Sequence, residues 1–123
     1  MFFQAEFNNG KEDGIQKAWY ENGQLIYEWH YKDGKQDGLL KEWFENGQLK
    51  EECNRKANKL YGLCRVWYEN GQLKEETNLK NGSGSYKEWH ENGRLKKKLY
   101  LEDGYRHLDK QCFDKDGKLI ECE

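Results

Sequence analysis

The chain has 123 residues, which is enough for one repeat array or one domain but leaves no room for a separate catalytic domain beside it. Charged side chains make up 36% of the residues, yet aromatic side chains reach 15%, and this share of large rings argues against a disordered chain. The formal net charge of −2 provides no field that would gather nucleic acid or anionic lipid, so neither is expected as a partner.

The first nine residues resemble the second half of a hairpin. Phe3, Ala5 and Phe7 precede Asn9-Gly10 in the same way as a later alternating run precedes Asp33-Gly34. Residues 1–9 are therefore interpreted as a partial repeat. No basic segment is followed by an apolar run, so neither a signal peptide nor a membrane span is predicted. Two readings remain: either the partial repeat caps a cytoplasmic protein, or a removed upstream signal sequence directed the protein to the periplasm or the cell surface.

One unit is then written out several times. Four tryptophans stand four residues before a glycine in the same frame, Trp-Tyr-Glu-Asn-Gly-Gln-Leu or a near copy. Successive glycines of this frame lie 22 or 24 residues apart, a period typical of stacked supersecondary units. The repeats are assigned to residues 10–33, 34–57, 58–81 and 82–103, and a divergent last repeat that serves as a cap is assigned to 104–123.

Each repeat is predicted to be a β-hairpin. In the second repeat, two short runs bracket Glu45-Asn46-Gly47, which is a turn signal. A two-residue turn would place Trp43 and Leu49 on opposite faces, whereas a three-residue loop with Gly47 left-handed at a bulge pairs them. We choose the three-residue loop. The connections between hairpins centre on Gly10, Gly34, Asn58, Gly82 and Gly104, residues that tolerate a positive φ. The fold class that follows is all-β, a hairpin meander in one elongated, twisted, single-layer antiparallel sheet.

One face of this sheet is expected to carry ladders of like residues. In the first repeat Tyr27, Trp29 and Tyr31 alternate with polar residues, and a period of two places them on the face of Ile15 and Trp19. Because an isolated hairpin is marginal in water, packing between neighbouring hairpins has to offset the loss of backbone entropy. The predicted structural ladder consists of Trp19, Trp43, Trp67, Trp89, Phe113, Leu25, Leu49, Leu73, Leu95 and Leu119.

The opposite face supplies the candidate partner-binding residues Tyr20, Phe44, Tyr68 and His90, which stand beside long charged side chains. Aromatic side chains in such a setting are enriched at protein interfaces. The sequence therefore predicts contact with a protein partner on this face.

The cysteines are expected to be reduced and to act as small apolar fillers. Cys53 and Cys64 have opposite parity in their expected strands, and no Cys-x-x-Cys motif is present. Cys112 and Cys122 would lie diagonally across the last hairpin, and a disulfide between them would need the register to slip.

Catalytic chemistry is sparse. None of the three histidines or of Ser83 and Ser85 stands in a nucleophile motif or at a metal-ligand spacing, so no enzymatic activity, cofactor or metal site is predicted. A local basic run, Arg94 with Lys96, Lys97 and Lys98, is interpreted as a solvated strand face.

The stretch from Asp37 to Glu52, Asp-Gly-Leu-Leu-Lys-Glu-Trp-Phe-Glu-Asn-Gly-Gln-Leu-Lys-Glu-Glu, resembles the bacterial variant of the MORN repeat that is found in YwqK-family antitoxins, and the resemblance covers nearly the whole chain. It implies an elongated single-sheet β-meander and, by analogy with some members, an antitoxin or immunity role. The chain departs from the pattern at Ser83-Gly84, where two residues are missing, and in the last repeat at Leu108 and Asp114. These departures predict a kink and a terminal cap.

Two functions follow as expectations. The first is a protein-binding module that occludes a partner, such as a toxin, by stoichiometric contact. The second is a structural or cell-surface-associated segment of a longer bacterial protein, in which the aromatic residues only hold the sheet together.

Overall fold

The computed structural model is an all-β hairpin meander, as the sequence predicts, and it describes residues 2–102 and 106–122, with the backbone alone for 106–108. No helix occurs in these ranges. Gly104, expected at a connection, and the side chain of Leu108, expected to mark the cap, lie outside what the structure describes. The chain forms two compact units, Met1–Leu60 and Tyr61–Glu123, which are taken separately below.

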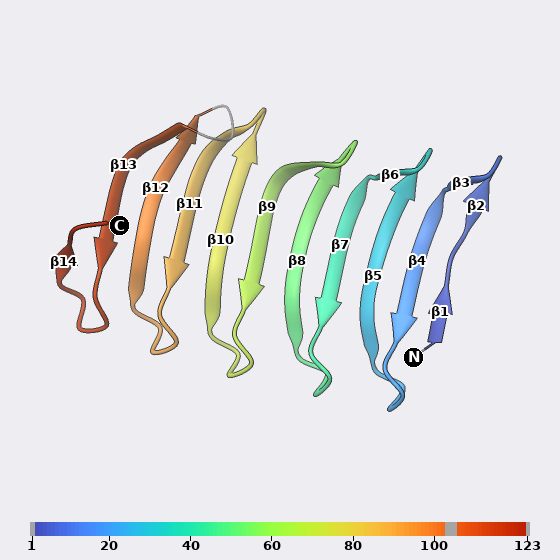
Figure 1. Ribbon diagram of the computed structural model, residues 1–123, viewed down its shortest axis with the longest axis horizontal. Coiled ribbons are helices and arrows are strands. Elements are labelled where there is room, and N and C mark those ends of the chain that lie inside the picture. The colour runs from blue at the N-terminus through green and yellow to red at the C-terminus, as the bar shows by residue number, and fades with distance from the viewer. Residues whose placement is uncertain (1, 103–105, 123) are drawn as a thin grey trace. The chain divides into compact units, whose positions relative to one another are not determined.

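The first unit is a single-layer antiparallel sheet with the strand order β1-β4-β5-β7-β8 (Figure 1). Strand β6 pairs with β5, and β2 and β3 form a separate two-stranded ribbon. The strands are β1 (Phe2–Gln4), β2 (Phe7–Asn8), β3 (Lys11–Glu12), β4 (Gly14–Trp19), β5 (Leu25–Lys32), β6 (Lys35–Gln36), β7 (Gly38–Trp43) and β8 (Leu49–Lys56).

The second unit has the same pattern, in which strands that follow one another in the sequence pair antiparallel. Strand β9 begins two residues before the boundary between the units. The strands are β9 (Lys59–Trp67), β10 (Leu73–Lys80), β11 (Ser83–Trp89), β12 (Leu95–Glu102), β13 (Arg106–Phe113) and β14 (Leu119–Ile120).

The hairpin loops confirm the choice of a three-residue loop. The Phe44 amide donates to the Gln48 carbonyl at 2.8 Å, and the Gly47 amide donates back to the Phe44 carbonyl at 2.9 Å. Gly47 has a φ of 89°, the left-handed conformation that glycine adopts without a steric penalty. Trp43 therefore pairs with Leu49 across the hairpin, as expected.

A β-bulge that the sequence did not predict changes the face to which the side chains of the second strand of each hairpin point. Ala18 pairs with Tyr27 and Trp19 pairs with Leu25, so Ile26 is an extra residue in β5. The same bulge inserts Lys50, Lys74 and Lys96 in the next three hairpins. Because side chains alternate along a strand, one extra residue moves everything beyond it to the other face.

The prediction that Tyr27, Trp29 and Tyr31 share a face with Ile15 and Trp19 is therefore wrong. Trp29 pairs with Gln16, and Ile15 pairs with His30. Directly opposite residues of a pair share a face. The aromatic run of β5 thus lies with Gln16 and Ala18, on the face that carries the most deeply buried side chains.

We call this side the buried face and the other side the ladder face. In the first unit the buried face carries Gln16, Ala18, Leu40 and Cys53, and in the second it carries Leu79, Leu99 and Cys112. Gln16 is the one polar residue of this set, and its Nε2 donates to the Glu6 carbonyl at 3.1 Å. None of these buried side chains is aromatic, and three of the seven, Ala18, Cys53 and Cys112, are small, which fits a thin sheet.

The ladder residues pair across each hairpin as predicted, but they are half-buried and do not form a closed core. Trp19, Trp67 and Trp89 pair with Leu25, Leu73 and Leu95, as Trp43 does with Leu49, and Phe113 pairs with Leu119. All are half-buried except Leu119, which is 65% exposed.

The prediction of reduced cysteines is wrong. Cys112 and Cys122 form a disulfide with 5.3 Å between their Cα atoms, and Cys53 and Cys64 are disulfide-bonded as well. Strand β14 ends at Ile120, two residues before Cys122. The backbone at Cys122 therefore does not follow the strand register, which would place this residue diagonally across from Cys112. Ala57 and Asn58, both with positive φ, form a two-residue turn between Lys56 and Lys59, and parity counted along the chain depends on the length of such a turn.

Replacing Cys122 with serine is expected to lower the stability of the last hairpin by about 2–3 kcal/mol, because the cross-link closes a short loop and restricts the unfolded chain. Urea unfolding of the parent and of Cys122→Ser would measure the difference. Cys122 is preferred to the more deeply buried Cys112, whose replacement would also disturb packing. Equal stability of the two proteins, or labelling of Cys112 by a thiol reagent in the unreduced parent, would contradict the cross-link.

Candidate functional site

The four predicted partner-binding residues occupy equivalent positions where a strand enters its hairpin loop. We call Tyr20, Phe44, Tyr68 and His90 the aromatic row. Each backbone amide in the row donates to the carbonyl of the residue four positions later, at 2.8 or 2.9 Å. Since each row residue directly follows a ladder residue, alternation turns its ring toward the buried face. Two members belong to each unit.

The polar ends of three row residues are hydrogen-bonded to the following repeat. The Tyr20 hydroxyl donates to the Trp43 carbonyl at 3.0 Å, and the Tyr68 hydroxyl donates to the Trp89 carbonyl at 2.8 Å. Nε2 of His90 lies 2.9 Å from the Phe113 carbonyl. A carbonyl only accepts, so the histidine must be protonated at Nε2. These contacts fix the rings, and all four side chains are half-buried.

The bulge residues cover part of the row. Nζ of Lys50 lies 5.8 Å from the centre of the Phe44 ring, and Nζ of Lys74 lies 5.6 Å from the centre of the Tyr68 ring. Both distances suit a cation–π contact. At Phe44 and Tyr68 the row therefore combines an aromatic ring with a flexible ammonium group, which can pair with a carboxylate or a carbonyl of a partner.

The asparagines of the hairpin loops join neighbouring repeats, which sequence reasoning did not predict. Oδ1 of Asn22 accepts from the Gln24 amide at 2.9 Å, while its Nδ2 donates to the Glu45 carbonyl at 3.1 Å. Asn70 and Asn92 repeat both contacts. The sequence contained a signal for these contacts, since four repeats have asparagine at this position. A turn alone would also accept aspartate, which has no amide group to donate to the next repeat.

A hollow of about 410 Å³ borders His90 in the second unit. Its lining includes Lys96 and Lys97 on β12, Phe113 on β13 and the Cys112–Cys122 disulfide. The basic residues Lys96, Lys97 and Lys98 therefore do not share one environment. Lys97 pairs with Glu88 and adjoins this hollow, whereas Lys98 stands opposite Lys87. In the preceding hairpin of the same unit, Arg65 and Glu76 occupy the positions on the ladder face that Lys87 and Lys98 occupy here. These two side chains form an ion pair, with 3.0 Å between Nε and Oε2.

A tyrosine on the buried face of the second unit has a strongly perturbed acidity. Burial raises the pKa of Tyr86 well above its ordinary value of 10.0, and the hydrogen bond from its hydroxyl to the Glu88 carboxylate, together with the nearby charge of Glu75, raises that pKa further. All these factors favour the neutral phenol. The arrangement holds a hydrogen bond in place and offers no ionised phenolate at neutral pH.

The stability of the protein is expected to fall as the pH rises above about 10. The pKa of Tyr86 is raised in the folded protein. Its contribution to the free energy of unfolding is therefore complete below the ordinary pKa of tyrosine and is lost at higher pH, because the unfolded chain releases the phenolic proton first. Between about pH 10 and pH 11 the parent should lose about 1 kcal/mol more than Tyr86→Phe, after allowance for partial exposure. Urea unfolding at both pH values measures this, and identical losses would contradict the assignment.

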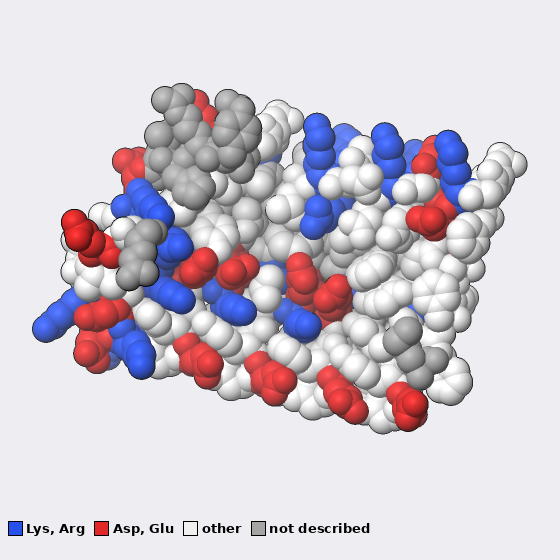
Figure 2. Space-filling model, in the orientation of Figure 1, with Lys and Arg blue, Asp and Glu red and all other residues white. Residues whose placement is uncertain are grey.

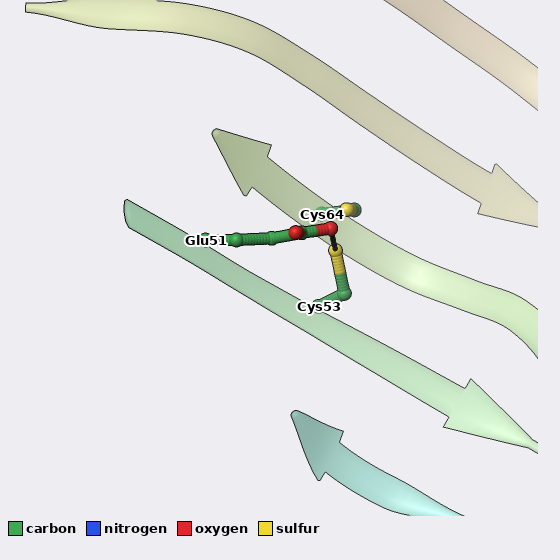
Figure 3. A group of neighbouring side chains, drawn as sticks. All are labelled: Glu51, Cys53 and Cys64. Atoms are coloured by element: carbon green, nitrogen blue, oxygen red, sulfur yellow. Dashed lines mark hydrogen bonds between the residues drawn. The ribbon is translucent and has the colours of Figure 1, made fainter. Parts of the chain in front are cut away.

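Among the residues that the structure describes, Glu51, Cys53 and Cys64 form a group with the ligand types of a metal site (Figure 3). The ligand form of cysteine is the thiolate, and both sulfurs are bound in disulfides. Oε1 of Glu51 lies 3.4 Å from Sγ of Cys53. A disulfide sulfur has no proton to donate, so this approach is a van der Waals contact. In this oxidised state the group supplies no thiolate to a metal.

The chain matches the family described as MORN repeat variant over residues 12–33, 36–57, 60–81 and 83–103. These four segments cover more than half of the chain. No curated protein matches the chain with significant similarity. In the part of the chain that the structure describes, no helix is long and apolar enough to cross a membrane. Because these four matches cover more than half of the chain and its repeats fold as hairpins, the chain belongs to the MORN repeat variant family.

Proposed function

We propose that this chain is a non-catalytic protein-binding module that acts by stoichiometric contact, in the manner of a bacterial antitoxin or immunity protein resembling the YwqK family. MORN repeats commonly serve as binding modules and are generally non-catalytic. The proposal takes the aromatic row, Tyr20, Phe44, Tyr68 and His90, as the contact surface. A partner held there would be occluded, with no chemical step.

The observation that carries the proposal is the way in which the row is held. Hydrogen bonds from Tyr20, Tyr68 and His90 to the next repeat fix side chains that would otherwise rotate. Fixed aromatic side chains lose little conformational entropy when a partner binds, and this favours them as anchors in interfaces. The lysines beside Phe44 and Tyr68 add a charge that can select the partner.

The same contacts also favour a second candidate function. A hydroxyl that bonds to the next repeat has a structural purpose without any partner, so the row is also consistent with a structural or cell-surface-associated segment of a longer bacterial protein. In that case, the aromatic side chains contribute to stability alone.

The experiment is a pull-down from the source cell followed by affinity measurements on the purified partner. We expect a protein partner, and we expect the double change Phe44→Ala, Tyr68→Ala to weaken binding at least tenfold. Tyr68→Phe is the matched control, because it keeps the ring and removes only the bond to the Trp89 carbonyl. It should lower the melting temperature without weakening binding.

Two outcomes would count against the binding module. Full affinity of a folded double variant would move the contact away from the row. A stability loss in every row variant, with no protein partner recovered, would favour the structural segment.

A further inference from the structure

The ladder face of the first unit carries a row of alternating charges that crosses four strands. Opposite residues of β4, β5, β7 and β8 form this row, in the order Lys17, Glu28, Lys41 and Glu52. Nζ of Lys17 lies 3.7 Å from Oε2 of Glu28, and Nζ of Lys41 lies 3.6 Å from Oε2 of Glu52. Opposite charges that face each other across strands stabilise a sheet. Each lysine of the row therefore has a carboxylate of its own hairpin as a partner.

The corresponding row of the second unit breaks this alternation. Opposite residues of β9 to β13 form it, in the order Arg65, Glu76, Lys87, Lys98 and Gln111. Nε of Arg65 lies 3.0 Å from Oε2 of Glu76, so the first hairpin of this unit keeps the ion pair. In the next hairpin Lys87 faces Lys98, at the position where the three preceding hairpins have a glutamate. Like charges in this arrangement destabilise a sheet.

Neither Lys87 nor Lys98 has an ion-pair partner among the residues that the structure describes. Glu76 stands on the other side of Lys87, but its carboxylate is held by Arg65. Gln111, on the other side of Lys98, is uncharged. Figure 2 shows acidic and basic side chains next to one another over β10 and β11, so opposite charges do meet in this unit. Both lysines are exposed, and a ligand can reach their ammonium groups from solvent.

The two lysines line a hollow of about 590 Å³, together with Ser85 and Gln111. All four side chains lie on the ladder face, because Ser85 is two residues from Lys87 in β11 and Gln111 is opposite Lys98. A serine hydroxyl and a glutamine amide both donate hydrogen bonds. The hollow therefore combines two cations with two neutral donors, a set of groups that suits a negatively charged oxygen.

The lining has an excess of positive charge. Among its described residues Asp109 is the one acid, and it forms no ion pair with Lys87 or Lys98. Lys110 also lines the hollow but has an interaction of its own, so its charge is left out of the balance. Two ammonium groups and one carboxylate leave a formal charge of +1. One further carboxylate would make the lining neutral.

We propose that this hollow binds a glutamate side chain of another protein. The carboxylate of that glutamate would lie against Lys87 as Glu28 lies against Lys17, and Lys98 would donate a second charge-assisted hydrogen bond to it. The site is on the ladder face, whereas the rings of the aromatic row are turned toward the buried face. The inference thus goes beyond the proposed function and does not rest on it.

The test uses a capped Gly-Glu-Gly peptide as the probe and a capped Gly-Gln-Gly peptide as the uncharged comparison. Nuclear magnetic resonance titration of the isotope-labelled full chain at low salt, followed at the amide signals of Lys87 and Lys98, measures binding. We expect the glutamate peptide to bind at least fivefold more tightly, because two ion pairs form with it. In about 1 M salt the difference should disappear, since the Debye length falls to about 3 Å.

Lys98→Gln should weaken binding of the glutamate peptide at least threefold. Lys97→Gln is the matched control, because Lys97 precedes Lys98 in β12 and pairs with Glu88 on the buried face. It removes the same charge from the opposite side of the sheet and should leave binding of the peptide unchanged.

Lys98→Glu restores the pair of opposite charges that the three preceding hairpins have. It should raise the melting temperature by about 2–5 °C, because an ion pair replaces a repulsion between like charges. It should also abolish binding of the glutamate peptide, because its own carboxylate would occupy Lys87. Loss of binding in a variant that melts at a higher temperature does not reflect unfolding.

Equal binding of the two peptides, equal weakening by Lys98→Gln and Lys97→Gln, or an unchanged melting temperature of Lys98→Glu would overturn the proposal. If the glutamate peptide does not bind while Phe44→Ala, Tyr68→Ala still abolishes partner binding, this inference fails and the proposed function stands. If the peptide binds as expected and no variant of the aromatic row affects a partner, the proposed contact surface fails and the glutamate site stands.

Discussion

Replacing Gly84 with alanine is expected to destabilise the second unit by about 3 kcal/mol or more. A Cβ atom on this residue would lie 1.8 Å from the carbonyl oxygen of Asn78 and 3.1 Å from the Cα of Leu79. These are backbone atoms of β10 in the register opposite β11, so no side chain can rotate away to make room. Overpacking of this kind costs about 1–3 kcal/mol or more, and a φ of 157° adds strain for a residue with a side chain.

The matched control is Gly71→Ala in the same unit. Gly71 has a φ of 87°, but a Cβ there would meet nothing within 4 Å. It should therefore cost only the roughly 1 kcal/mol of a left-handed alanine. Urea unfolding of the two variants separates steric contact from conformational strain, and equal losses would show that β10 and β11 are not as close at Gly84 as the structure has them.

Replacing Trp43 with alanine is expected to cost about 3 kcal/mol, at the low end of the range for truncation of a tryptophan because the side chain is half-buried. Its partner across the hairpin is Leu49, which is also half-buried. Phe113→Ala should cost clearly less, because its partner Leu119 is 65% exposed. Thermal and urea unfolding would measure both changes, and a larger loss for Phe113→Ala would refute the ladder as the main apolar contact.

The sequence determined the repeat, the hairpins and the loop geometry, because these depend on residues close together in the chain. The Asn-Gly signal and the separation of Trp43 from Leu49 were enough to choose the three-residue loop with Gly47 left-handed. The aromatic row was also visible in the sequence, since Tyr20, Phe44, Tyr68 and His90 recur in one frame. What this row binds remains a proposal.

The tertiary structure decided which face each side chain occupies. The bulge at Ile26, Lys50, Lys74 and Lys96 leaves no distinctive residue type in the sequence, because its position is set by pairing with the neighbouring strand. One extra residue reverses the alternation, and it moved Trp29 from the expected ladder face to the buried face. The cysteines were misjudged for a related reason, since parity depends on turn length and on where a strand stops.

The hollow on the buried face of the first unit could not be predicted from the sequence at all. Trp29, Glu42 and Arg55 lie on three strands, and nothing in their spacing along the chain shows that they share a face. The bonds from Tyr20 and Asn22 to the following repeat were hidden in the same way, because they join residues 23 positions apart. Local sequence specifies the hairpin, whereas contacts between strands of different hairpins depend on a register that only the folded sheet establishes.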